Sequence, residues 1–178
     1  MTDLEFLKTV SEAEKKLGYS SKKFSGAVVT ELLRNVCQEA GLTTSKPNSF
    51  IVDVPIEVDL LIVSYTPDPY LDLIYRPEEV IACFEVKKSG LIADSRTKVN
   101  SDFHRIQTYC PNAKLFYVSL SEDQNRIQSL ERSDKSFVFF KRHKGKYSST
   151  GDYNRFLQML EFLKQEQVLR TAAYKVSG

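Results

Sequence analysis

Residues 80–90 have the sequence Val-Ile-Ala-Cys-Phe-Glu-Val-Lys-Lys-Ser-Gly, an apolar run that ends in charged residues. Side chains alternate between the two faces of a strand, so Glu85 and Lys87 are expected on one face, with Phe84 and Val86 on the other. A carboxylate and an ammonium at the end of a buried strand are costly to desolvate unless they are paired or used. This stretch is therefore the first candidate for chemistry.

A second acid lies in the run Ile-Glu-Val-Asp-Leu-Leu-Ile-Val at residues 56–63. The run begins with alternating polar and apolar residues and becomes continuously apolar, which is typical of a central strand with a buried inner end. If this strand is a neighbour of the strand at 80–86, Asp59 and Glu85 can converge on one divalent cation.

The chemistry of such a pair favours a hard metal ion. Carboxylate oxygens from Asp59 and Glu85 suit Mg²⁺ or Mn²⁺, and the backbone carbonyl of Val86 is a further candidate ligand. Lys87 would then orient or deprotonate the attacking water and offset the charge of a nearby phosphate. These are the requirements for hydrolysing a phosphodiester.

The remaining elements surround these two strands. Helices are expected at about 3–17 (with a capping box from Thr2 to Glu5), 25–40, 97–109 and 151–168, and further strands at 50–52, 71–75, 113–120 and 137–140. Residues 121–132 are polar, with a helix as one possibility. The order strand, helix, strand predicts a right-handed crossover. We expect one α/β domain in which helices flank a central mixed sheet.

Asp59 followed by Glu85-Val86-Lys87 resembles the motif of the PD-(D/E)XK nuclease superfamily, which has the restriction-endonuclease-like fold. The resemblance covers about residues 25–120, the αβββαβ core of that fold. The helices at 3–17 and 151–168 would then be additions to this core within a single domain over residues 1–178. Asp59 is not preceded by proline, so the motif departs from the compact Pro-Asp pair of the family name. Pro67-Asp68 offers that pair, but prolines on both sides of Asp68 exclude a central strand there.

The resemblance implies a magnesium-dependent endonuclease that cleaves nucleic acid, with double-stranded DNA preferred over RNA, in restriction, repair or mobile-element conflict. Members often carry a metal-binding glutamate on the helix before the first strand, and Glu31 fits that position. Polar residues on the helix after the motif often complete the site. His104 and Gln107 are the candidates here, and the alternative for both is an ordinary polar face of the helix.

Positive residues could contact the nucleic-acid backbone. The candidates are Lys88 beside the motif and Lys141, Arg142 and Lys144 in the basic run 141–146. The alternative for this run is a solvated turn, and the formal net charge of +2 does not make the whole chain a basic coat.

Three simpler explanations compete at the motif itself. Glu85 and Lys87 could form an ordinary ion pair at a strand end. Asp59 could protect an edge strand, and Glu31 could be a solvated helix residue. The chain would then be a non-catalytic module that keeps the nuclease fold to bind nucleic acid or protein.

The terminal helix offers another alternative. An apolar stripe that includes Phe156, Leu160 and Leu163 could mediate assembly of an interaction protein, although such stripes more often form intrachain core. A homodimer is also compatible with a nuclease, because cutting both strands of a duplex commonly needs two active sites.

The composition and the motifs that are absent bear on the cellular location and on the class of enzyme. Three scattered cysteines among 178 residues argue against a disulfide framework or a zinc knuckle. No signal-peptide or membrane-spanning pattern is present. We therefore expect a cytoplasmic protein without a membrane partner. The absence of a glycine-rich phosphate loop and of a serine elbow argues against nucleotide-driven motors, dehydrogenases and serine hydrolases.

Overall fold

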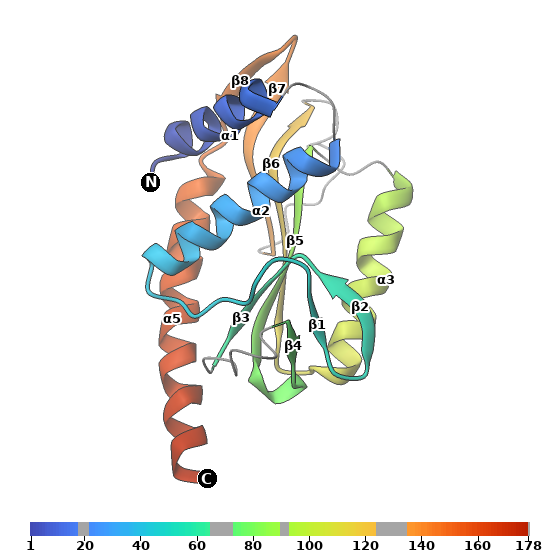
Figure 1. Ribbon diagram of the computed structural model, residues 1–178, viewed down its shortest axis with the longest axis vertical. Helices are drawn as coiled ribbons and strands as arrows, with labels where there is room; N and C mark the ends of the chain where they lie inside the picture. Colours follow the sequence, from blue (N-terminus) through green and yellow to red (C-terminus); the bar gives the residue numbers. More distant parts are fainter. Residues whose placement is uncertain (18–21, 65–72, 90–92, 124–134, 178) are drawn as a thin grey trace.

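The computed structural model describes residues 1–17, 22–64, 73–89, 93–123 and 135–177 (Figure 1). The helices are α1 (Asp3–Leu17), α2 (Lys22–Glu39), α3 (Ala93–Tyr109) and α5 (Asp152–Ser177), with a short 3-10 helix, η1 (Pro77–Glu79). The strands are β1 (Ser49–Ile51), β2 (Val54–Val58), β3 (Leu60–Val63), β4 (Ile74–Tyr75), β5 (Val80–Ser89), β6 (Lys114–Asp123), β7 (Ser136–His143) and β8 (Lys146–Ser149). Each helix expected from the sequence is present.

The strands form two sheets. The larger has the order β3-β5-β6-β7-β8, and the smaller has the order β2-β1-β4. Strands β5, β6 and β7 are parallel, whereas β3 and β8 lie antiparallel at the two edges. The connection from β5 through α3 to β6 is the expected crossover. The predicted α/β class with a central mixed sheet is confirmed.

Helices cover both faces of the larger sheet (Figure 1). Apolar residues of α1, α2 and α5 share one core with alternate residues of β5, including Phe84 and Val86. On the other face Cys83 packs with Ile106 of α3 and with residues of the smaller sheet. Strand alternation thus separates the two cores. It also places Glu85 and Lys87 on the α3 side, the face of Cys83.

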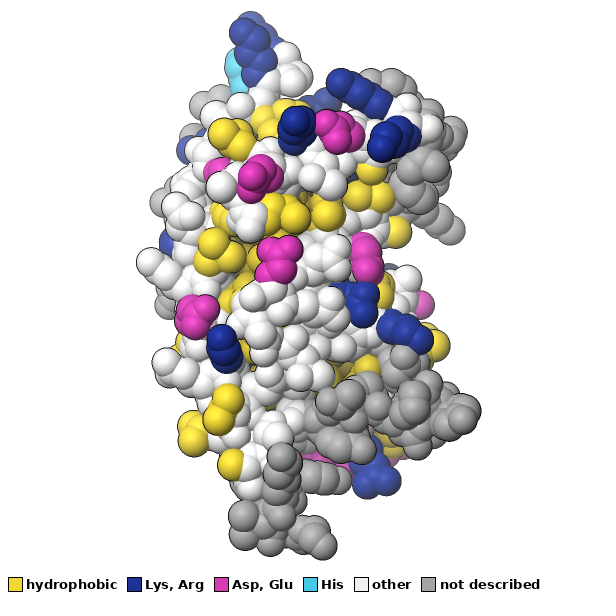
Figure 2. Space-filling model, turned by 60° about the vertical axis from the view of Figure 1, so that its left-hand side comes forward, with side chains coloured by type: hydrophobic (Ala, Val, Ile, Leu, Met, Phe, Trp, Pro, Cys, Tyr) yellow, Lys and Arg dark blue, Asp and Glu magenta, His cyan; other side chains and the backbone are white. Residues whose placement is uncertain are grey.

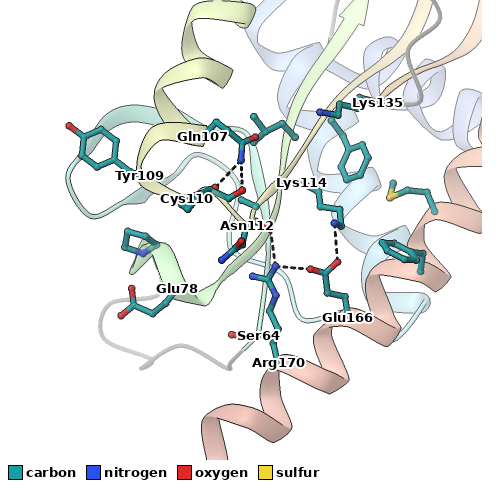
Figure 3. A pocket seen from close by; sticks show the side chains of 17 residues that line it. Ser64, Glu78, Gln107, Tyr109, Cys110, Asn112, Lys114, Lys135, Glu166 and Arg170 are labelled. Atoms are coloured by element: carbon teal, nitrogen blue, oxygen red, sulfur yellow. Dashed lines mark hydrogen bonds and ion pairs between the residues drawn. The ribbon is translucent and has the colours of Figure 1, made fainter. Parts of the chain in front are cut away.

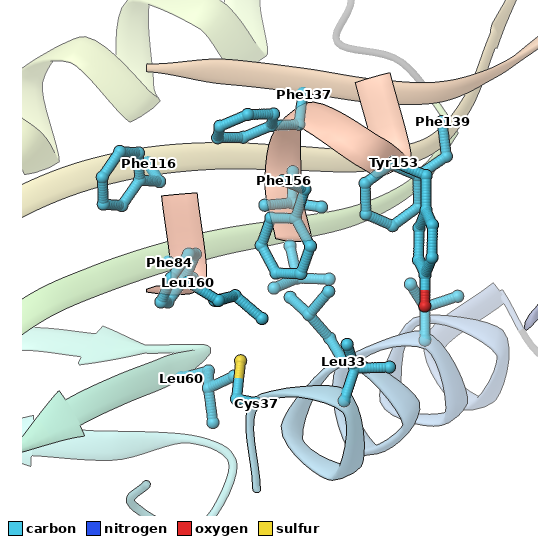
Figure 4. Packing of buried hydrophobic residues seen from close by; sticks show 14 of the residues in the cluster. Leu33, Cys37, Leu60, Phe84, Phe116, Phe137, Phe139, Tyr153, Phe156 and Leu160 are labelled. Atoms are coloured by element: carbon cyan, nitrogen blue, oxygen red, sulfur yellow. The ribbon is translucent and has the colours of Figure 1, made fainter. Parts of the chain in front are cut away.

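The main core is dominated by aromatic rings (Figure 4). Phe156 of α5 is fully buried, and its ring contacts Phe84, Phe137, Phe139 and Tyr153. The apolar stripe of the terminal helix is therefore intrachain core, which removes the observation behind the interaction-protein alternative. Helices α1 and α5, expected as additions to the nuclease-like core, both contribute buried side chains to this hydrophobic core.

Polar contacts fix the second half of α5 to the edge of the sheet. The amide of Gln167, which is buried, accepts a hydrogen bond from the backbone of Thr43 and donates to the carbonyls of Thr43 and Val63. Arg170 donates to the carbonyls of Val80 and Asn112. These bonds satisfy backbone groups at an edge that would otherwise face the helix unpaired.

Several elements differ from the sequence prediction; α5, for example, extends to Ser177 instead of ending at about residue 168. The strand expected at 56–63 is divided at Asp59, where the chain passes from the smaller sheet into the larger one. Residues 121–123 continue β6, and most of the remaining polar stretch, like Pro67-Asp68, lies outside the described residues. Residues 146–149 form the unexpected strand β8.

The three cysteines lie in the two cores of the fold. All three are buried free thiols. In the described part of the chain, every helix is too short or too polar to cross a bilayer.

Candidate active site

The site forms where β3 and β5 lie side by side. These strands pair antiparallel, with Leu60 opposite Phe84. Extending that register by one residue places Asp59 opposite Glu85. The two acids predicted to share a cation therefore lie on adjacent chain segments, as the sequence required.

Three contacts hold the motif together. The backbone N–H of Val86 donates a hydrogen bond of 2.7 Å to Oδ2 of Asp59. The Lys87 ammonium lies 3.4 Å from the same oxygen and forms an ion pair with Oε1 of Glu85. The ammonium also lies 3.3 Å from the carbonyl oxygen of Val86. Asp59, Glu85 and Lys87 thus converge on one side of the sheet.

Partial burial and neighbouring charges shift the pKa values of Glu85 and Lys87. The side chains of Asp59 and Glu85 are each 23% exposed, and that of Lys87 is 35% exposed. Burial and the nearby charge of Asp59 raise the pKa of Glu85, and the charge of Lys87 opposes this rise. Burial alone would lower the pKa of Lys87, but the two carboxylates outweigh it and raise that pKa. Lys87 is therefore protonated at neutral pH.

The oxygen donors fit a hard divalent cation. Among the contacts of the described residues, Asp59 uses Oδ2 and Glu85 uses Oε1, which leaves one oxygen of each carboxylate for a metal. The carbonyl of Val86 faces the same ammonium and is a third oxygen. Two carboxylates and a carbonyl suit Mg²⁺, which usually keeps several waters. Within the described residues, no three Asp, Glu, His or Cys side chains form a ready cage.

The structure does not bring Glu31 into this group. Its carboxylate forms a 2.8 Å ion pair with Arg34 one turn along α2, and its side chain is 47% exposed. Helix α2 covers the face of the sheet opposite to α3. The contacts of Glu31 are those of a solvated helix residue.

His104 and Gln107 occupy the end of α3 farther from the motif. Gln107 donates hydrogen bonds to the carbonyls of Cys110 and Pro111, so its amide closes the end of the helix. His104 is exposed. Neither side chain has a described contact with the motif residues.

The positive candidates have two different settings. Lys88 points to the opposite face from Lys87 and forms an ion pair with Glu14 of α1. Lys141, Arg142 and Lys144 lie on and beside the turn of the β7–β8 hairpin.

Sequence reasoning missed Asp102. This half-buried residue of α3 is the second charge that raises the pKa of Glu85, after that of Asp59. The available signal was helical spacing: Asp102 follows the buried Val99 by three residues and therefore borders the buried face of α3. It brings a further negative charge to the site.

A separate groove lies at the other end of the parallel strands (Figure 3). Its volume is about 1210 Å³, and its walls come from the end of α3, the start of β6 and α5. Three of its charged groups pair with one another: Glu166 lies 2.6 Å from Arg170 and 3.5 Å from Lys114. The groove is therefore a different feature from the carboxylate–lysine site.

Comparisons with known proteins bear on the fold. No protein-family model matches the sequence, and a search of the curated proteins found no match. The chain is similar in structure to NucC of P. aeruginosa ATCC27853 in its cAAA-bound form, with a TM-score of 0.61, 10% identity and coverage of 98% of this chain and 95% of that one.

NucC of E. coli MS115-1 is also similar. Its apo form gives a TM-score of 0.51 at 13% identity, covering 98% of this chain and 99% of that one. Its cAAA-bound form gives 0.55 at 12% identity, covering 91% and 90%. NucC is an endonuclease of the PD-(D/E)XK type. At this identity the likeness bears on the fold alone: the expected α/β fold is confirmed, and this chain shares the overall fold of NucC.

Proposed function

We propose that this protein is a metal-dependent endonuclease that hydrolyses phosphodiester bonds of double-stranded DNA. The observation that carries the proposal is the convergence of Asp59, Glu85 and Lys87 at the junction of β3 and β5. A nuclease fold alone would also suit a binding module. The complete acid–acid–lysine set favours catalysis over that alternative, because a non-catalytic module has no use for three partly buried charges.

Asp59, Glu85 and Val86 would together form the metal site. A bound Mg²⁺ or Mn²⁺ would supply Lewis acidity and positive charge at the scissile phosphate. Asp59 and Glu85 would hold it, with the carbonyl of Val86 as a third donor. The N–H of Val86 fixes the orientation of the Asp59 carboxylate, so little reorganisation is needed at the moment of reaction.

Lys87 would act on the reacting groups. Its ammonium is shared between two carboxylates. Once a cation neutralises them, Lys87 would stabilise the negative charge that develops on the phosphate and orient the attacking water. A protonated lysine suits this electrostatic role, and its raised pKa supports it.

Plasmid cleavage tests the proposal. We expect the protein to convert supercoiled DNA to nicked or linear forms with Mg²⁺ or Mn²⁺, and to lose this activity when EDTA removes the metal. The assay is run with and without cAAA, because two of the similar NucC structures contain it. Cleavage that needs cAAA would indicate regulation of this chain by a cyclic oligonucleotide. Full cleavage in EDTA, or none with either metal in both arms, would contradict the proposal.

Metal binding should depend on pH through Glu85. Only the ionised carboxylate binds a cation, so Mn²⁺ affinity should fall as pH drops through the pKa of Glu85, which lies above the ordinary 4.5. Lys87 lowers that pKa, so Lys87→Met should move the midpoint to higher pH. Calorimetric titration with Mn²⁺ over a pH series measures it.

Lys88→Met is the matched control for this titration. It removes the same charge from the next residue, but Lys88 is on the other face and pairs with Glu14. Its midpoint should stay near that of the wild type. Equal shifts in the two variants would show that Lys87 has no special effect on Glu85.

A further inference from the structure

We propose that the β7–β8 hairpin is a DNA-binding arm that contacts the backbone of the duplex about six base pairs from the cleavage site. The choice of duplex DNA as the ligand rests on the proposed function. Three properties of the hairpin support this role: its charge, its rigidity and its position relative to Lys87.

The positive charge of the hairpin is concentrated towards its turn, while at its base β6 places Glu122 and Asp123 opposite Lys141 and Arg142. Four of its side chains are exposed, and a fifth, that of Lys141, is half-buried; the exposed ones are Arg142, His143, Lys144 and Lys146. Among the residues that the structure describes, no carboxylate lies within ion-pair distance of any of them. Elsewhere ion pairs are common, and they involve Lys8, Arg34, Lys87, Lys88, Lys114, Arg155 and Arg170.

This contrast has a physical meaning. The chain carries a formal net charge of only +2, yet four lysine and arginine side chains and one histidine lie within residues 141–146, at the tip seen at the top of Figure 2. Like charges held together repel one another, and the phosphates of a bound polyanion would relieve that repulsion. Binding would also release the counterions condensed on the polyanion, which favours association. The tip therefore has the electrostatics of a phosphate-binding element.

The hairpin is also preorganised. Lys144 and Gly145 both have positive φ values, 46° and 79°, as in the tight two-residue turns that match the twist of paired strands. Arg142 is paired with Tyr147, and its guanidinium lies 5.7 Å from the centre of that ring. The Tyr147 ring also packs edge-on against the buried Phe140. A fixed arginine loses less conformational entropy on binding.

The base of the hairpin is fixed as well. The side chain of Asp152 accepts a hydrogen bond of 3.1 Å from the N–H of Val138, and the backbone of Thr150 donates to the carbonyl of Phe139. Ser149 donates to Asp3 at the start of α1. The arm is therefore attached to the same sheet that carries the site.

Strand register gives the spacing between arm and site. Lys87 is paired with Ser119 on β6, and Ser119 is paired with Val138 on β7. Lys144 is six residues beyond Val138, so it projects past the level of Lys87 by about 20 Å. For a duplex whose axis runs along these strands, with a rise of about 3.4 Å per base pair, this corresponds to about six base pairs. A projecting two-stranded ribbon also has the shape that enters a DNA groove.

Fluorescence anisotropy with a labelled duplex in EDTA tests the arm without cleavage. Arg142→Gln with Lys144→Gln should weaken binding at least about tenfold at low salt and reduce the salt slope by about 2. The control removes the same charge with Lys8→Gln and Lys164→Gln, two exposed residues on the helices covering the opposite face. The control should bind within about twofold of the wild type.

The outcomes separate this inference from the proposed function. Suppose that the wild type cleaves DNA, but that the hairpin variant binds DNA as tightly as the wild type or that the hairpin and control variants lose affinity equally. The DNA-binding role of the hairpin is then wrong, and the proposed nuclease activity is retained. If the hairpin variant alone loses binding but the wild type never cleaves, the arm stands and the nuclease fails. If the hairpin variant loses binding to phosphatidylserine vesicles but binds DNA as the wild type does, the DNA-binding role of the hairpin is also wrong, and the hairpin binds a membrane surface instead.

Discussion

Asp59→Asn and Lys87→Met should each reduce plasmid cleavage by at least on the order of 10²–10³-fold, the range for removing one preorganised electrostatic group. Asparagine keeps the shape of Asp59 but removes the charge that faces Lys87 at 3.4 Å. Methionine keeps the packing of the lysine stem but removes its ammonium. Single-turnover cleavage rates at saturating Mn²⁺ measure both effects.

The two variants should differ in metal binding, and that difference separates their roles. Asp59→Asn removes a metal ligand, so its Mn²⁺ affinity should fall together with its cleavage rate. Lys87→Met removes a positive charge from beside the metal, so Mn²⁺ should bind at least as tightly while cleavage is lost. Calorimetry reads binding without requiring activity.

Matched controls exclude general effects of charge. Glu57→Gln neutralises an exposed acid two residues before Asp59, and Lys164→Met neutralises an exposed lysine on α5. Both proteins should cleave DNA at the wild-type rate. If Asp59→Asn and Lys87→Met also cleave normally, the catalytic centre does not lie at the junction of β3 and β5.

The central part of this site could be read from the sequence because it depends on local rules. Strand alternation placed Glu85 and Lys87 on one face, and the apolar run after Asp59 identified the neighbouring strand. The capping box between Thr2 and Glu5 forms for the same reason: hydrogen bonds three residues apart follow from helix geometry. Such features need no knowledge of distant contacts.

The residues that sequence reasoning misplaced or missed depend on tertiary placement. Glu31 had the right position along the chain, but α2 covers the other face, and Arg34 supplies a closer partner. Asp102 influences Glu85 only because α3 packs on the motif side of the sheet. The division at Asp59 reflects a change of sheet that no local pattern encodes.

Strand β8 is another element that local sequence patterns do not predict. Its residues are mostly exposed and lack alternating apolar positions, so periodicity gives no strand signal. It forms because β7 is already fixed and the Lys144-Gly145 turn returns the chain alongside it. A basic run that resembles a solvated turn in sequence becomes an ordered ribbon in the fold.

Phe156→Ala should lower the free energy of unfolding by about 3–5 kcal/mol, the usual cost of removing a buried phenylalanine. The ring has no exposed surface, and its centre lies 5.5 Å from those of Phe137 and Phe139 and 6.1 Å from that of Phe84. A domain of this size is stable by about 5–15 kcal/mol, so the variant should be close to unfolding. Urea denaturation followed by circular dichroism measures the loss.

Phe162→Ala is the matched control on the same helix. Its ring is 54% exposed and lies 5.5 Å from the ammonium of Lys114, so truncating it should cost about 1 kcal/mol or less. The difference between the two variants isolates burial, because residue type and helix are the same. Equal losses would mean that α5 contributes through its helical structure rather than through the aromatic core. A large loss for Phe156 alone would show that the terminal helix holds the sheet that presents Asp59, Glu85 and Lys87.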